Sequence, residues 1–189
     1  MPDIAFIVEG QLEQRAVNRA CPNHKVVLLG ANGDSVTIAT ICNRIETHYR
    51  LFSNRYYPII VIFDREHRRE TTEEIESALV KELTSRGIDS KQFIFFISDR
   101  KFECMFLAHI GEDGDYHKSG CPQTTCVDGL DGVSELKSRL MQKGLRYHKT
   151  TTGLELFKLV RPTILASKSP SFKRFQSQIL QYCRWAGIV

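Results

Sequence analysis

Carboxylate side chains follow two apolar runs of the sequence at short spacing. The run 4–8 leads into Glu9 and Glu13, and a second apolar run leads into Asp64 and Glu66. An apolar run without polar alternation is typical of a parallel strand that is covered on both faces. Such strands end at one edge of a sheet, so we expect these acids to converge there. Crowded carboxylates repel one another unless a cation lies among them, and the pattern therefore predicts a divalent metal site.

Each acid has a position that suits a role at this site. Glu9 and Asp64 directly follow their strands; Glu13 lies one helical turn beyond the first of these acids, and Glu66 two residues beyond the second. A further acid, Glu103, follows another predicted strand and can face the same edge. The predicted ligands of Mg²⁺ or Mn²⁺ are Glu9, Asp64, Glu66 and Glu103. The predicted catalytic residues are Glu9, Glu13, Asp64 and Glu66. For any one of them, a solvated loop position or a helix cap is the alternative.

Basic residues near the second acidic pair predict contact with a polyanion. They are Arg65, Arg68 and Arg69 around this pair, and Lys173 and Arg174 near the end of the sequence. We expect these side chains to bind the backbone of a nucleic acid electrostatically, and a solvated charged loop is the alternative. The segment 149–153, a lysine followed by three threonines and a glycine, could contact phosphate or be an ordinary loop.

The elements that must position these residues alternate between strands and helices. Strands are predicted at 4–8, 25–29, 59–63 and 92–97. Helices are predicted at 11–20, 35–52, 73–86 and 102–110, with Ser35 and Thr72 as N-cap residues. This alternation predicts an α/β fold in which a parallel four-stranded, Rossmann-like sheet is flanked by helices.

The rest of the sequence predicts a helical and loop-rich extension. Residues 111–132 are rich in turn-forming residues, and helices are expected at 134–143, 154–159 and from Ser169 to about residue 185. We expect a single domain, with a core at 1–110 and an extension at 111–189 that packs on it. The apolar side chains of the last helix could pack against the core or against a partner, which leaves a homo-oligomer open.

Composition places the chain among globular proteins. With 189 residues, 42% of them hydrophobic, it can bury one sizeable core. Its longest apolar stretches are far shorter than the ~20 residues that span a bilayer, and its first residues do not resemble a signal peptide. We therefore expect a cytoplasmic protein with no membrane contact. Six cysteines without a framework spacing are then expected to be mostly free thiols.

A second constellation of metal-ligating residues lies in the glycine-rich stretch. It consists of His109, His117, Cys121 and Cys126. A Zn²⁺ ion there would explain how so irregular a segment is ordered. The spacing does not match a common zinc motif, so an ordinary loop is the alternative.

At the acidic residues the chain resembles the Toprim domain, a module shared by topoisomerases, bacterial primases, small ribonucleases and OLD-family nucleases. Toprim proteins carry a glutamate after the first strand and an Asp-x-Asp motif after the third. Glu9, Gly10 and Glu13 are similar to the Glu-Gly-x-x-Glu form of OLD-type members. Asp64 and Glu66 take the Asp-x-Asp place with one departure, because the second acid is glutamate. This departure leaves open whether one ion or two is bound.

Two further segments are similar to small stand-alone Toprim-like proteins of bacterial defence loci, of the OLD-like or RloB-like type. They are 102–108, which begins Phe-Glu-Cys-Met-Phe-Leu, and 169–175, Ser-Pro-Ser-Phe-Lys-Arg-Phe. The resemblance implies a metal-dependent nuclease that hydrolyses phosphodiesters in anti-phage defence. It also implies an ATPase of the ABC/SMC type as a partner.

Two other functions fit the same residues. The departure at Glu66 allows a non-catalytic Toprim-like subunit that binds an ATPase or a nucleic acid. A phosphotransfer enzyme with Asp64 as its nucleophile would also suit a doubly wound sheet. That enzyme would want a lysine, serine or threonine after a later strand, and Ser98 is a partial match.

Overall fold

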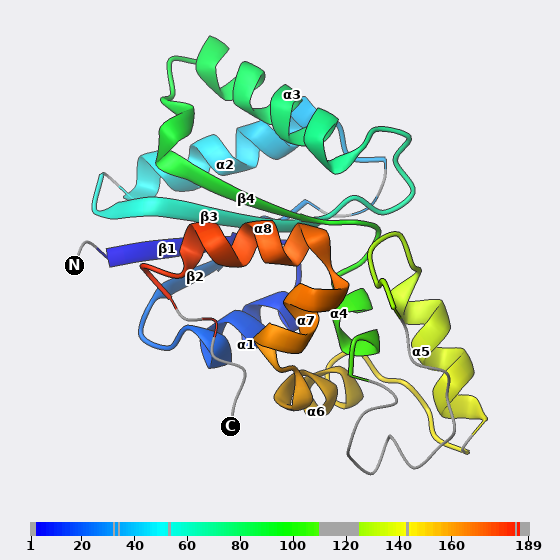
Figure 1. The fold of residues 1–189 in the computed structure, drawn as a ribbon. Helices are drawn as coiled ribbons and strands as arrows, with labels where there is room; N and C mark the ends of the chain where they lie inside the picture. The colour runs from blue at the N-terminus through cyan, green and yellow to red at the C-terminus, as the bar shows by residue number, and fades with distance from the viewer. Residues whose placement is uncertain are drawn as a thin grey trace.

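The computed structural model is an α/β fold built on a four-stranded sheet in which all strands are parallel. It describes residues 3–31, 33, 35–52, 54–109, 125–142, 144–183 and 185. The strands are β1 (Asp3–Val8), β2 (Lys25–Leu28), β3 (Tyr56–Asp64) and β4 (Phe93–Ser98), in the spatial order β2-β1-β3-β4. Helices flank the sheet on both faces (Figure 1), so the predicted fold class is confirmed.

The register of the strands brings two of the predicted acids, Glu9 and Asp64, to one edge of the sheet. Val8, the last residue of β1, lies opposite Ile62 of β3, and Asp64 lies opposite Ser98 at the end of β4. Glu9 continues the ladder, since its amide donates to the Ile62 carbonyl oxygen at 3.0 Å. β1 and β3 are the central strands, and their buried apolar side chains fix this register.

One face of the sheet is covered by α2 (Ile38–Phe52) and α3 (Thr72–Ser85), which lie together on one side of it in Figure 1. Their apolar side chains form a core with strand residues such as Ile7, Val61 and Phe95. A short 3-10 turn, η1 (Ser90–Gln92), leads from this layer into β4. The alternating burial of the strands thus divides the apolar side chains between two layers.

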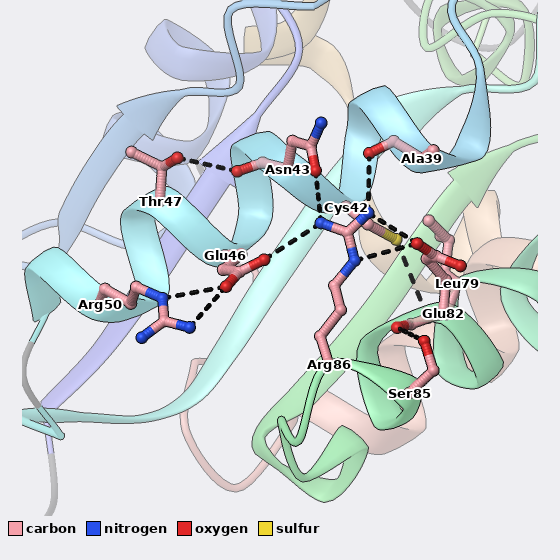
Figure 2. Close-up of polar contacts among 10 residues, drawn as sticks. All are labelled: Ala39, Cys42, Asn43, Glu46, Thr47, Arg50, Leu79, Glu82, Ser85 and Arg86. Carbon is pink, nitrogen blue, oxygen red and sulfur yellow. Dashed lines mark hydrogen bonds and ion pairs between the residues drawn. The ribbon is translucent and has the colours of Figure 1, made fainter.

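Arg86, directly after α3, joins the two helices of this face. Its guanidinium donates to Asn43 and Glu46 of α2 and to Glu82 of α3, as Figure 2 shows. Cys42 lies in the same cluster, and burial raises the pKa of its thiol to about 11. The thiol is therefore protonated at neutral pH, and we assign the cluster a structural role.

The opposite face carries α1 (Gln11–Ala20) together with the helices that follow residue 125. These are α5 (Gly132–Met141), α6 (Thr152–Leu159), α7 (Pro162–Lys168) and α8 (Pro170–Ile179). α8 packs against β4, where the ring of Phe175 stacks on that of Phe96 with centroids 4.5 Å apart. Trp185 is fully buried against Phe175. Side chains of these C-terminal helices therefore share one core with α1 and the sheet.

The starts of two helices differ from the prediction for local reasons. α2 begins after Thr37, whose hydroxyl accepts from the Thr40 amide at 3.2 Å, so Ser35 is not its N-cap. α3 begins one residue earlier than predicted, because Thr71 and Glu74 form a capping box in which each side chain bonds to the other's amide. Each helix start has two hydroxyl residues close together, Ser35 and Thr37 before α2 and Thr71 and Thr72 at α3. In each pair, only the residue whose hydroxyl accepts a hydrogen bond from a helix amide caps the helix.

The C-terminal half also departs from the prediction. The segment 102–110 forms only the short helix α4 (Cys104–Leu107) within the described residues, and α7 was not predicted. The last helix ends at Ile179 instead of near 185, because the chain turns so that Cys183 reaches Cys21. None of the described helices is long and apolar enough to cross a bilayer.

Cys21 and Cys183 form a disulfide between the end of α1 and the segment after α8. The prediction of mostly free thiols did not include this pair, since its partners lie 162 residues apart. Of the predicted zinc constellation, His117 and Cys121 lie outside the described residues. Cys126 is exposed. The zinc site stays a prediction.

Candidate metal centre

Three buried carboxylates meet at the C-terminal edge of the sheet. Glu13, Asp64 and Glu103 each offer one oxygen atom, and these atoms lie within 4.8 Å of one another. The residues are 2%, 6% and 0% exposed, respectively. Carboxylates buried this close together bind a cation or carry protons, because their repulsion is weakly screened. We call these three residues the acidic triad.

Each acid of the triad is delivered by a different element. Glu13 lies in the first turn of α1, where the helix dipole favours a negative charge. Asp64 is the last residue of β3, and Glu103 directly precedes α4 in the turn after β4. The Asp64 Oδ1 atom accepts a hydrogen bond from the Phe102 amide at 2.8 Å, which ties the end of β3 to the turn after β4.

Two glycines leave the space that the triad occupies. A Cβ atom at Gly10 would lie 2.7 Å from the Glu13 Oε2 atom. At Gly132, the first residue of α5, a Cβ atom would lie 2.5 Å from the Glu103 carbonyl carbon and 2.8 Å from the Cys104 Cα atom. A larger residue at either position would therefore displace an acid of the triad or the backbone that carries it.

Some oxygen atoms of the triad receive no hydrogen bond within the part of the chain that the structure describes. Glu13 Oε2 and Glu103 Oε2 are buried without a hydrogen-bond partner among the described residues. A cavity of about 260 Å³ opens at this edge of the sheet. Its lining residues are Glu9, Gly10, Glu13, Gly33, Asp64, Glu66 and Lys149. Because a buried charge without a partner is strongly unfavourable, oxygens of this kind are suited to bind a cation.

The protonation of the triad reflects the same crowding. Burial raises the pKa of Asp64 well above its ordinary range, and the charges of Glu9, Glu13 and Glu103 raise it further. Burial also raises the pKa of Glu13, an effect that the nearby Lys149 opposes. A divalent ion would favour the charged forms of these groups and reverse both shifts.

The donor set suits a hard divalent cation. All the ligand atoms of the triad are carboxylate oxygens, which Mg²⁺ and Mn²⁺ prefer over sulfur or imidazole ligands. The adjoining cavity leaves room for water or substrate oxygens to complete an octahedral set. Glu13, Asp64 and Glu103 are therefore residues that could hold the Mg²⁺ or Mn²⁺ that the sequence predicts.

A protein-family model matches nearly the whole chain. The model described as a domain of unknown function, DUF4276, matches residues 8–180. The chain belongs to the DUF4276 family. The matched range includes every residue of the acidic triad, so the site lies inside the DUF4276 domain. Neither the curated proteins nor the solved structures gave a significant match.

In this DUF4276 chain, Glu9 stands beside the triad and faces the same cavity. Its Oε2 atom accepts from the Asp64 amide at 2.7 Å, and its Oε1 atom accepts from the Gly33 amide at 3.2 Å. Burial raises the pKa of Glu9 despite these two hydrogen bonds, and the charges of Glu13 and Glu66 add to the rise. The sequence predicts Glu9 as ligand and base, and the structure places it as a fixed carboxylate at the cavity wall.

Glu66 also lines the cavity, but its surroundings differ from those of the triad. Its backbone is left-handed, with φ at +59°, a conformation that costs a non-glycine residue about 1–2 kcal/mol. Its amide donates to the Arg100 carbonyl oxygen at 2.8 Å, and its carboxylate lies 3.6 Å from the Lys101 Nζ atom. The structure therefore places Glu13, rather than Glu66, beside Asp64 in the triad. The left-handed turn at Glu66, which causes this placement, cannot be predicted from the Asp-x-Glu spacing.

Two of the arginines predicted to bind nucleic acid support the turn after β3. The Arg65 guanidinium is paired with Asp99 at 2.6 Å and donates to the Arg68 carbonyl oxygen at 2.7 Å. Arg68 in turn donates to the Gly33 carbonyl oxygen at 3.2 Å. In this geometry both side chains hold the loop that carries Glu66.

The other predicted basic residues lie on the surface of the DUF4276 domain. Arg69 and Lys173 are exposed. Arg174 of α8 forms ion pairs with Glu73 and Glu76 of α3, at 3.4 and 3.1 Å. These pairs connect helices from opposite faces of the sheet beside the edge strand β4. Arg174 thus has acidic partners within the fold.

The structure adds two residues that the sequence did not assign to the site. The Lys149 Nζ atom lies 3.3 Å from Glu103 Oε1 and 3.6 Å from Glu13 Oε1. The Tyr147 hydroxyl donates to the same Glu103 oxygen at 3.5 Å. Burial opposes the charge on Lys149, but the two glutamates raise its pKa and keep the ammonium charged. The only signal in the sequence is the basic, threonine-rich segment 149–153, and no spacing connects it to the acids.

Proposed function

We propose that this protein is a metal-dependent nuclease that hydrolyses phosphodiester bonds at the C-terminal edge of its sheet. The observation that carries the proposal is the buried acidic triad, in which two oxygens have no donor among the described residues. Hard oxygen ligands beside an open cavity are what enzymes acting on phosphate esters use to hold Mg²⁺ or Mn²⁺.

The ligands in this proposal are Glu13, Asp64 and Glu103. A bound divalent ion supplies Lewis-acid polarisation of the phosphate. The chain itself orients the three carboxylates through separate elements and keeps bulk water away from their buried oxygens. The ligand set differs from the one predicted from the sequence, because Glu13 replaces Glu9 and Glu66.

Glu9 is the general base in this proposal. Two backbone amides fix its carboxylate at the cavity wall, and burial raises its pKa, which makes it a stronger base than an ordinary glutamate. In the reaction, a water oxygen forms the new bond to phosphorus and Glu9 takes one proton from that water. The ester P–O bond breaks, and the leaving oxygen takes a proton from solvent.

The substrate class in this proposal is nucleic acid. The exposed Arg69 and Lys173 can contact a phosphate backbone, which gives binding that depends on salt and little on base sequence. The Toprim resemblance of the segments around Glu9 and Asp64 points to the same class. The anti-phage role and the ABC/SMC-type ATPase partner rest on this resemblance alone. A cytoplasmic location belongs to the same proposal.

A cleavage assay tests the proposal. Plasmid DNA, single-stranded DNA and tRNA are incubated with Mg²⁺ or Mn²⁺ and wild type, Asp64→Asn or Glu103→Gln. We expect metal-dependent cleavage by wild type, and loss of it in both variants. Glu9→Gln should bind metal and cleave about 10²–10⁴-fold more slowly. Glu70→Gln, an exposed acid outside the cavity, is the matched control. Metal-dependent cleavage that survives in Asp64→Asn would overturn the proposed site.

A metal-binding subunit without catalytic activity is the second candidate. The pairing of Glu66 with Lys101 favours it, since one carboxylate of the Asp-x-Glu pair is already neutralised. Metal binding by wild type without cleavage of any of the three substrates would select this candidate. The phosphotransfer alternative loses its serine, because Ser98 is only 2% exposed and does not line the cavity, whereas Lys149 does.

A further inference from the structure

Only some of the oxygen atoms of the acidic triad face protein donors. Glu13 Oε1 and Glu103 Oε1 face the Lys149 ammonium, and Asp64 Oδ1 accepts from the Phe102 amide. One oxygen of each acid remains. Glu13 Oε2 and Glu103 Oε2 have no donor among the described residues, and the second oxygen of Asp64 receives no hydrogen bond from them. Three oxygens, one from each acid, would be available to a single divalent ion.

The other acids of the cavity have partners of their own. Both oxygens of Glu9 accept backbone hydrogen bonds, from Asp64 and from Gly33. The Glu66 carboxylate is paired with Lys101. A second ion bound by Glu9 would share both of its oxygens with these amides, and the Lys101 ammonium would repel an ion bound by Glu66. Among the described residues, the surroundings of the cavity acids therefore favour one ion, at the triad.

Lys149 brings a positive charge to the acidic triad. Its Nζ atom contacts two acids of the triad and lines the same cavity, while its side chain remains 50% exposed. The charges agree with this position, since one divalent ion and one ammonium balance three carboxylates. We propose that the centre holds a single divalent ion and that Lys149 takes the role of the second one. This inference rests on the proposed function, because Lys149 would contact a non-bridging oxygen of the phosphate undergoing hydrolysis.

The loop that carries Lys149 is held against α1. A Cβ atom at Gly153 would lie 3.1 Å from the Tyr147 hydroxyl and 3.2 Å from Leu12 Cδ1, so the loop and α1 pack closely there. The Gly153 amide donates to the His148 carbonyl oxygen at 3.1 Å, which closes the turn around Lys149. The ammonium is thus positioned by the fold, and its charge is available without an ordering cost during the reaction. Lys149 keeps its protons throughout and acts only through its charge and hydrogen bonds.

The test is a titration of Mn²⁺ into metal-free protein by calorimetry, with cleavage measured on the same samples. Wild type should bind one Mn²⁺ per chain. Lys149→Met should still bind one ion, at least about 10-fold more tightly, because a neighbouring positive charge has been removed. Its cleavage rate should fall about 10²–10³-fold. Lys91→Met, at an exposed lysine before β4 and outside the cavity, should behave as wild type in both measurements.

The outcomes separate this inference from the proposed function. Two Mn²⁺ ions per wild-type chain would overturn the role of Lys149. So would a Lys149→Met protein with unchanged Mn²⁺ affinity. One ion per chain with tighter binding by Lys149→Met, but no cleavage of any substrate, would support the single-ion centre and overturn the nuclease. No Mn²⁺ binding by wild type would overturn both.

Discussion

At the scale of single residues, Asp64 combines burial with three neighbouring acids. Asp64→Asn keeps an oxygen that can accept from the Phe102 amide and removes the charge. We expect the metal-free variant to be more stable than wild type by about 1 kcal/mol, or about 2–4 °C in Tm for a chain of this size. Thermal unfolding in EDTA measures the difference.

The same substitution should remove the stabilisation that Mn²⁺ gives to wild type. Glu70→Gln serves as control, because it removes an exposed charge outside the cavity and should follow wild type with and without metal. A metal-free Asp64→Asn protein that unfolds at a lower temperature than wild type would contradict the view of Asp64 as an unfavourable buried charge.

The stability of the metal-free protein should depend on pH through Asp64 and Glu13. A carboxyl group whose pKa is higher in the folded chain stabilises the fold below its unfolded pKa, and this contribution is lost as the pH rises through the folded pKa. The ordinary values are 3.8 for Asp64 and 4.5 for Glu13, and burial raises both in the fold. In EDTA, we therefore expect the difference in stability between wild type and Asp64→Asn to grow, against wild type, as the pH rises above about 4.

Denaturant unfolding in EDTA at several pH values measures this dependence. Mn²⁺ should stabilise wild type most at the upper end of the pH range, because ligand carboxylates must lose their protons to bind it. A wild-type protein that gains stability relative to Asp64→Asn as the pH rises in EDTA would show that the pKa of Asp64 is not raised.

At the scale of elements, the start of α5 supports the acid that precedes α4. A Cβ atom at Gly132 would collide with the backbone of Glu103 and Cys104. Gly132→Ala should destabilise the fold by about 1–3 kcal/mol and weaken Mn²⁺ binding, because Glu103 must move. Denaturant unfolding and Mn²⁺ titration measure the two effects. Ser138→Ala, on the exposed side of the same helix, should change neither.

The elements show which parts of the site the sequence could predict. The acids after β1 and β3 could be placed at one edge, because apolar runs reveal buried parallel strands. The sequence assigned Glu13 a catalytic role but omitted it from the ligands, since its distance from Asp64 depends on how α1 leaves the sheet. Glu66 could not be placed, because its left-handed backbone depends on contacts with the loop after β4. Lys149 reaches the acids only through the packing of its loop on α1.

At the scale of the whole molecule, the disulfide between Cys21 and Cys183 joins α1 to the end of the described chain. A cross-link across so long a segment typically stabilises a protein by about 2–4 kcal/mol. We expect a reducing agent to lower the Tm of wild type and to leave that of Cys21→Ser unchanged. Peptide mapping after alkylation identifies the linked pair. Alkylation of both cysteines in protein purified without reductant would contradict the disulfide.

The sheet and its first helices could be predicted, whereas the packing of the second half could not. The predicted helices near 134–143 and 154–159 are present as α5 and α6. Their placement depends on contacts between distant residues, such as Phe96 with Phe175, and periodicity within a helix does not specify its partner.

The contribution of Lys149 to an acidic edge built by the first 103 residues has a consequence for protein synthesis. A ribosome adds about 5–20 residues per second, so the growing chain carries Glu13, Asp64 and Glu103 for several seconds before Lys149 is made. An unfinished chain therefore has the acids without their ammonium and lacks the loop that holds it. In the proposed nuclease, a growing chain that has not yet reached Lys149 would therefore cleave far more slowly than one that carries it.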